Sequence, residues 1–170
     1  MRHRKPFFLS VIAAAVAALA MPITALAADT YMDTVGGVEI AATPTKGTFT
    51  GTANGDLPGT WLATVVHNRL TGAVPAAITG GSFSLATTLD ESGTLITGDF
   101  VGGTVRQTTV LTGCSNETYA VNGNLGNVGP PGANTGTGRF VATLTHYRVR
   151  LFTRCLTYSA SIAGTINLTF

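Results

Sequence analysis

Two histidines are the residues of this chain best suited to acid–base chemistry. His67 lies in the run WLATVVHNRL, and His146 lies in LTHYRVR. Imidazole titrates near neutral pH, so either side chain could act as a general base or as a ligand. The alternative is a histidine that forms a hydrogen bond at the rim of the fold, and we favour it because reactive groups are rarer than structural ones. Two histidines without a nearby run of Asp or Glu predict no metal site.

Arginines follow the second histidine at strand spacing. Arg148 and Arg150 share one face of an expected strand with His146, and Arg154 follows near the next turn. Guanidinium groups placed in this way could hold a carboxylate head group at the mouth of a pocket. The other interpretation is a solvated outer face that protects a Thr-rich strand from aggregation. The surface role is favoured, and Arg148 and Arg150 remain candidate anion contacts.

The first 27 residues have the pattern of a secretory signal peptide. MRHRK is a basic start, PFFLSVIAAAVAALA is an apolar run, and Ala25-Leu26-Ala27 offers the small residues of a cleavage site. We predict cleavage after Ala27 and a secreted or periplasmic protein. Loss of Arg2, Arg4 and Lys5 lowers the ten Lys and Arg to seven, against eight Asp and Glu, so the mature net charge is −1. This charge is not that of a nucleic-acid-binding protein, which needs a basic surface.

The chain has two cysteines, Cys114 and Cys155. In an exported protein two cysteines indicate a disulfide, and we predict a bond between them. Neither thiol is then free for catalysis. The adjacent carboxylates Asp90 and Glu91 lie in DESG, a sequence typical of a solvated hairpin turn. The glycine-rich runs do not link a strand to a helix as nucleotide-binding loops do, so no cofactor is predicted.

Alternation of apolar and polar residues predicts the elements that carry these groups. LTYSASIAGTINLTF, at 156–170, alternates along its whole length, as expected of a long strand with one apolar face. Shorter alternating runs are SFSLATTL and TYAVNGNL, and Gly-rich turn sequences separate them. Strands are expected at 46–53, 59–69, 77–89, 94–101, 103–112, 117–125, 138–151 and 155–169.

These strands predict an all-β fold. About eight strands, without a convincing helix, indicate an antiparallel β-barrel, and the length of the last two favours a barrel over a sandwich. We expect one barrel domain at 46–170, preceded by a partly ordered segment at 28–45. No apolar run after the leader approaches the roughly 18 residues of a membrane-spanning helix.

A barrel of this size can hold one small ligand. Eight strands enclose an interior just wide enough to be filled by side chains or to take one small molecule. The many Gly, Ala and Thr residues leave interior space, so we expect a mainly apolar pocket open at one end. Trp61 and Phe83 are expected in its wall, with His67 or His146 as the polar group near its mouth.

Four short motifs carry a family resemblance. They are GTFTGT at 47–52, DLPGTW at 56–61, ITGGSF at 78–83 and GTGRF at 136–140. In these motifs the chain resembles secreted bacterial proteins with an allene oxide cyclase barrel-like domain, which is calycin-like. The resemblance implies an eight-stranded barrel with an apolar interior, which in the cyclase folds a reactive lipid into a cyclopentenone. No catalytic residue of the cyclase matches a position here.

Three functions remain open, and the sequence does not decide whether the protein is an enzyme. The favoured one is a soluble secreted barrel that binds a small apolar molecule or has another non-catalytic role. The second is a cyclase or isomerase that uses the same cavity. The third is a small outer-membrane barrel, because Leu168 and the final Phe170 imitate the last strand of such proteins. Few aromatic residues, and Thr and Gly on both strand faces, favour the soluble protein.

Overall fold

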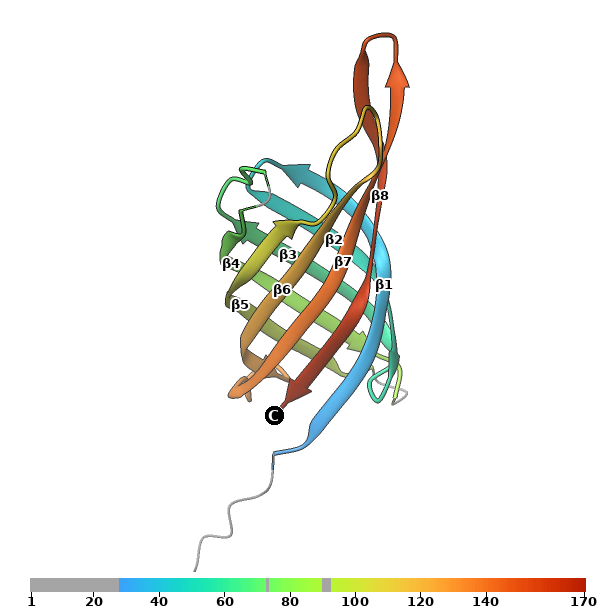
Figure 1. The fold of residues 1–170 in the computed structure, drawn as a ribbon. Helices are drawn as coiled ribbons and strands as arrows, with labels where there is room; N and C mark the ends of the chain where they lie inside the picture. Colours follow the sequence, from blue (N-terminus) through green and yellow to red (C-terminus); the bar gives the residue numbers. More distant parts are fainter. Residues whose placement is uncertain (1–27, 73, 90–92) are drawn as a thin grey trace, which may run out of the picture.

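The chain folds into one closed β-barrel. The computed structural model describes residues 28–72, 74–89 and 93–170 (Figure 1). The barrel strands are β1 (Thr30–Thr43), β2 (Lys46–Gly55), β3 (Gly59–His67), β4 (Ala76–Thr87), β5 (Leu95–Gln107), β6 (Glu117–Gly129), β7 (Gly136–Leu151) and β8 (Arg154–Thr169). Each strand pairs antiparallel with the next, and β8 pairs with β1 to close the sheet. The predicted all-β, eight-stranded barrel is confirmed.

The described ranges contain no helix long and apolar enough to cross a membrane. The predicted signal peptide at 1–27 and the carboxylates Asp90 and Glu91 lie outside the described residues.

The barrel begins earlier than the sequence predicts. The segment 28–45, expected to be only partly ordered, contains β1, which pairs with both β2 and β8, so the barrel starts at Thr30 rather than at residue 46. Its pattern misleads because Asp33 is buried while Met32 and Ile40 are exposed.

The strands expected at 94–101 and 103–112 form one strand, β5. The glycines between them form an irregularity in the pairing of β5 with β6, where a turn was expected. The predicted count of eight strands therefore agrees with the structure because one strand was missed and another was divided.

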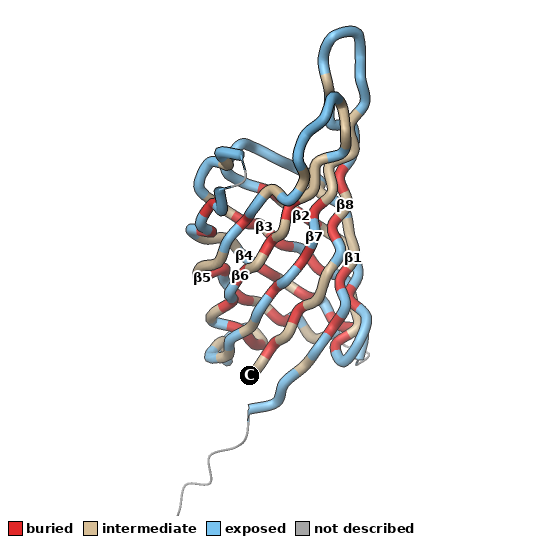
Figure 2. The backbone as a smooth tube through the Cα atoms, viewed as in Figure 1, coloured by how far each residue is buried: buried red, intermediate tan, exposed pale blue. Residues whose placement is uncertain are grey.

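Aromatic and branched side chains fill the middle of the barrel. Buried and exposed residues alternate along the strands, as Figure 2 shows. Trp61 is central, and its Nε1 donates to the carbonyl oxygens of Thr52, at 3.1 Å, and Gly36, at 3.3 Å. Gly37 leaves room for the ring of Trp61. A Cβ on residue 37 would lie 3.0 Å from Cζ2 of Trp61 and would collide with the carbonyl oxygen of Thr50.

The two ends of the barrel differ. The first described residues and the C-terminus meet at the lower end of Figure 1, where the backbone amide of Phe170 donates to the carbonyl oxygen of Asp29 at 3.2 Å. At the upper end, β7 and β8 continue beyond the other strands as a two-stranded hairpin (Figure 1). We call residues 148–158 of this hairpin the arm.

Candidate functional site

A cavity opens into the barrel at the upper end, below the arm. Its volume is about 250 Å³. Because strand positions alternate between the two faces of a sheet, every second residue near the upper strand ends faces the interior, and there the residues are mostly small or branched. The apolar lining residues are Ala42, Pro44, Phe49, Val65, Leu70, Val105, Val121 and Leu144.

A histidine and a carboxylate form a pair in the cavity wall. Nε2 of His146 donates to Oε2 of Glu39 at 2.9 Å, and the two side chains are 19% and 9% exposed. The pair joins β7 to β1 and spans β8, the strand between them. The residue of β8 that pairs with His146 is Ala160, and its short side chain leaves room for the contact. Because Nε2 carries the proton in this bond, the neutral ring has Nδ1 as its basic nitrogen.

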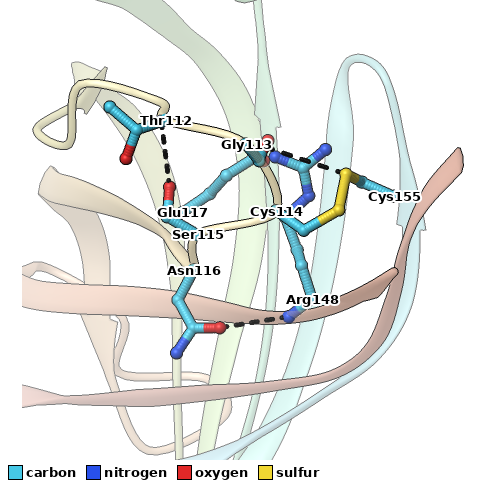
Figure 3. Close-up of a disulfide and its surroundings, with 8 residues drawn as sticks. All are labelled: Thr112, Gly113, Cys114, Ser115, Asn116, Glu117, Arg148 and Cys155. Atoms are coloured by element: carbon cyan, nitrogen blue, oxygen red, sulfur yellow. Dashed lines mark hydrogen bonds and ion pairs between the residues drawn. A yellow bond between two sulfur atoms is a disulfide. The ribbon is translucent and has the colours of Figure 1, made fainter. Parts of the chain in front are cut away.

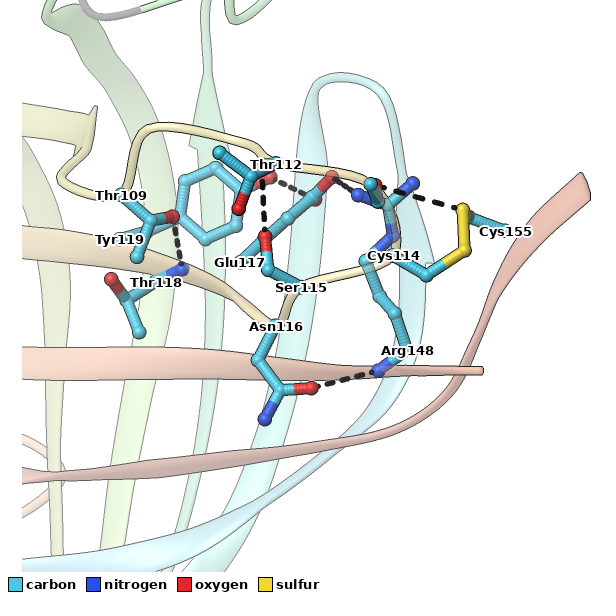
Figure 4. A network of polar contacts seen from close by, with 11 residues as sticks. Thr109, Thr112, Cys114, Ser115, Asn116, Glu117, Thr118, Tyr119, Arg148 and Cys155 are labelled. Atoms are coloured by element: carbon cyan, nitrogen blue, oxygen red, sulfur yellow. Dashed lines mark hydrogen bonds and ion pairs between the residues drawn. A yellow bond between two sulfur atoms is a disulfide. The ribbon is translucent and has the colours of Figure 1, made fainter. Parts of the chain in front are cut away.

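Tyr119 lies beside this pair and is itself held in place. Its ring centroid is 5.2 Å from that of His146, and its hydroxyl donates to Oε2 of Glu117 at 2.7 Å. The other oxygen of Glu117 accepts from Arg148 at 2.7 Å (Figure 4). Burial, followed by the hydrogen bond to Glu117, raises the pKa of the Tyr119 hydroxyl far above its usual range. The phenol therefore stays protonated and offers no base.

His67 reaches the same cavity from β3. Its Nδ1 donates to the carbonyl oxygen of Asn68 at 2.7 Å, so Nε2 is left as the acceptor of the neutral ring. Lys46 and Arg69 also line the cavity and are exposed, so the mouth carries positive charge. The structure thus brings together the two histidines that the sequence singled out, from strands far apart in the chain.

Trp61 and Phe83 do not line this cavity. Trp61 is 1% exposed and lies deeper in the barrel, where its ring packs 5.9 Å from that of Phe140. Phe83 is also fully packed in the core. The sequence analysis expected both side chains in the cavity wall, but local patterns carry no information on how far each residue lies from the open end.

Arg148 and Arg150, the candidate anion contacts, lie outside the cavity. Arg148 is bound by Glu117, and Arg150 is exposed on the arm; neither lines the cavity. The pairing of β7 with β8 shifts register between Tyr147 and Arg148. The extra residue of this irregularity, Tyr158, belongs to β8, so the alternation of β7 continues. Arg148 therefore shares the face of His146 and binds Glu117, the residue that pairs with His146, but neither arginine lines the cavity because both lie farther along β7, on the arm.

Glu39, Glu117 and Tyr119 are site residues that the sequence analysis missed. Tyr119 had a usable signal, because it shares the alternating apolar positions of TYAVNGNL with Val121. Glu39 had none, since it lies in β1, where the apolar pattern is mixed.

The predicted disulfide is confirmed. Cys114 and Cys155 are bonded, with their Cα atoms 5.5 Å apart, and the described residues contain no free cysteine. The bond ties the β5–β6 loop, residues 108–116, to the arm at Cys155, which pairs with Arg150 (Figure 3). The backbone amide of Arg148 also donates to Oδ1 of Asn116 at 3.2 Å, so loop and arm are joined twice.

Within residues 28–72, 74–89 and 93–170, no group of three or more His, Cys, Asp or Glu side chains is placed to hold a metal ion. Comparison of the chain with protein-family models, curated proteins and solved structures finds no match.

Proposed function

We propose that this protein binds a small, mainly apolar molecule in the cavity at the upper end of the barrel. The observation that supports this most is a cavity of about 250 Å³ with apolar walls and few polar groups. Ligand sites have this composition, in which apolar walls supply affinity and a few polar groups fix orientation. An apolar cavity of about 150 Å³ already holds benzene, so this one has room for a somewhat larger molecule.

The polar groups of the cavity suit a ligand with one polar end. His67 and His146 enter from opposite parts of the wall, while Lys46 and Arg69 lie at the rim. A ligand would place its apolar part against residues such as Val121 and Leu144, and its polar part near the histidines. The resemblance to the allene oxide cyclase barrel-like domain agrees with this proposal, because it too implies an apolar barrel interior.

A fluorescent apolar probe tests the proposal. N-phenyl-1-naphthylamine should bind with a saturable rise in its fluorescence. Val121→Phe places a larger ring in the cavity and should weaken binding about tenfold or more, because the probe and the new ring compete for the same space.

Val141→Phe is the matched control, because Val141 lies on the neighbouring strand with an exposed side chain. It should bind the probe as the unchanged protein does, and both variants should keep their melting temperature. No saturable binding to the unchanged protein, or an equal loss in both variants, would contradict the proposal.

Acid–base catalysis on the bound molecule, as in a cyclase or isomerase, is the second candidate. The bond between His146 and Glu39 favours it, because a carboxylate that fixes the tautomer of an imidazole prepares that ring to transfer protons. If this occurs, the protein should accelerate exchange of the α-protons of cyclohexanone in D₂O, as followed by NMR. His146→Gln should abolish the acceleration but change probe affinity only modestly; a binding protein should show no acceleration in either form.

We also propose that the protein is exported, with a signal peptide cleaved after Ala27, and acts in the periplasm or outside the cell. The disulfide is compatible with such a location. N-terminal sequencing of the exported protein tests this proposal, with Ala28 expected as the first residue.

The distribution of apolar residues favours a barrel that works in water over the outer-membrane alternative. The barrel interior is filled by apolar residues such as Trp61, Phe140 and Leu168. Outward positions of several strands carry threonine, for example Thr34, Thr60 and Thr143. Outer-membrane barrels have the opposite arrangement, with an apolar band outside and a polar lumen.

A further inference from the structure

The arm presents apolar side chains to solvent beyond the end of the barrel. Phe152, at its tip, is 91% exposed. The β5–β6 loop, which the disulfide bonds to Cys155 of the arm, contains Val110, and that side chain is 88% exposed. The further exposed apolar residues of these two segments are Leu111, Val149, Leu151, Leu156 and Tyr158. These residues gather on two segments held together by a disulfide, whereas single exposed apolar residues elsewhere need no explanation.

Phe152 also occupies a conformation that few side chains adopt. It is the first of two residues in the turn between Leu151 and Arg154, and its φ is +56°. Glycine or asparagine is usual at such a position, while a bulky residue there is strained. Strain of this kind is concentrated at functional sites. The turn therefore exposes the ring of Phe152 to solvent even though the backbone conformation of this residue is unfavourable for a large side chain.

The charges around this apolar tip are positive. Arg150 and Arg154 are exposed and form no ion pair within the described residues. Neither the arm nor the β5–β6 loop contains an Asp or Glu. Three more basic residues of the same end of the barrel are Lys46, Arg69 and Arg106.

The opposite end of the barrel is acidic. Asp29, Asp33 and Asp56 lie there, close to the chain termini. The molecule is therefore electrically asymmetric, with its positive end on the side of the arm and the cavity.

We propose that the arm inserts its tip into the surface of a bilayer that contains anionic phospholipid. Phe152 and Leu151 would enter the boundary between head groups and acyl chains, where apolar side chains gain free energy by leaving water. Arg150 and Arg154 would remain at the phosphate level, since long basic side chains keep their charge in the polar layer.

Lipid suits these residues better than a protein surface does. The arm carries the ring of Phe152 at the end of a narrow projection, with the charges of Arg150 and Arg154 directly behind it. This inference does not depend on the proposed ligand. If both are correct, the cavity mouth faces the membrane, so an apolar molecule could pass from bilayer to barrel over a short path.

Vesicle sedimentation tests the inference. The full mature protein should sediment with vesicles of an equimolar mixture of phosphatidylcholine and phosphatidylglycerol, and less with vesicles of phosphatidylcholine alone. Phe152→Asn removes the apolar tip but tolerates the positive φ, and it should weaken binding about tenfold. Arg150→Gln and Arg154→Gln should each weaken binding to the anionic vesicles about fivefold and leave the weaker binding to neutral vesicles unchanged.

Matched controls lie away from the arm. Met32→Gln removes an exposed apolar side chain, and Arg139→Gln removes an exposed charge, both in the half of the barrel that holds the chain termini. Neither should alter sedimentation. Phe152→Asn should keep or raise the melting temperature, which separates lost binding from lost folding. Absence of binding to anionic vesicles, or binding that the controls weaken as much as the arm variants, would overturn the inference and point to a protein partner.

Discussion

Asp33 is a buried carboxylate, and only one of its two oxygens has a hydrogen-bond partner within the described residues. The backbone amide of Leu57 donates to its Oδ1 at 2.9 Å, while its Oδ2 has no partner within the described residues. Burial raises the pKa of Asp33 above its ordinary value of 3.8, the bond from Leu57 opposes this, and the nearby charge of Asp56 adds to the increase. The charged form of Asp33 therefore destabilises the folded state at neutral pH.

Asp33→Asn should stabilise the barrel at neutral pH. Because the pKa is higher in the folded chain than in the unfolded chain, the folded state binds more protons between these two pKa values. Stability is therefore greatest below the unfolded value of 3.8 and falls as the pH rises through the folded value. Asparagine keeps an oxygen that can accept from the amide of Leu57 and removes the charge, so the free energy of unfolding at pH 7 should rise.

Denaturant unfolding at neutral and at acid pH measures this difference. The advantage of Asp33→Asn should disappear as the pH approaches 3.8. Asp29→Asn is the control, because Asp29 is an exposed aspartate near the same end of the barrel and is not among the groups that shift the pKa of Asp33. If Asp33→Asn changed the free energy of unfolding equally at both pH values, the charge of Asp33 would not be the cause of the difference.

At the scale of elements, β1 shows what an alternation pattern can and cannot predict. The long strands β7 and β8 were predictable, because one face of each is mostly apolar over much of its length. β1 escaped detection, because its inward positions include Asp33 and Glu39, while Val38 and Ile40 face outward. Asp33 and Glu39 lie near opposite ends of the strand, and both interrupt the apolar alternation that would have identified it. Glu39 is also a residue of the site.

Removal of β1 should therefore abolish folding rather than trim a loose segment. A chain that begins at Ala28 should give the β-sheet circular dichroism spectrum and cooperative melting of the barrel. A chain that begins at Lys46 would leave edges of β2 and β8 unpaired and the buried side chain of Trp61 without Gly36 as a hydrogen-bond acceptor. It should be unfolded or aggregated. Cooperative melting of this shorter chain would show that β1 is dispensable.

At the scale of the whole molecule, the fold class could be predicted but the composition of the site could not. Strand length and turn sequences are local, and they were enough for a closed barrel of about eight strands. The bond between Glu39 and His146 joins residues 107 apart in the chain and spans an intervening strand. Its existence depends on register and on the small Ala160, which no local pattern reveals.

The same limit explains the arginines and the aromatic residues. Spacing predicted that Arg148 and Arg150 would share the face of His146, and Arg148 does so and binds Glu117, but both arginines lie beyond the cavity. Alternation predicted that Trp61 points inward, but depth along the barrel decides whether an inward side chain fills the core or lines a cavity. Both histidines line the cavity, and their positions near strand ends are a local feature that the sequence displays.

The pairing of β1 with β8 has a consequence for how the chain is made. Thr30 pairs with Thr169, so the first and last strands to leave the ribosome or an export channel are partners. Until the final residues arrive, β1 keeps one edge unpaired, as does β7, and such edges invite contact with other chains. Pairing between residues so distant in sequence is also slow. The barrel therefore cannot close until β8 has been delivered after the seven strands that precede it.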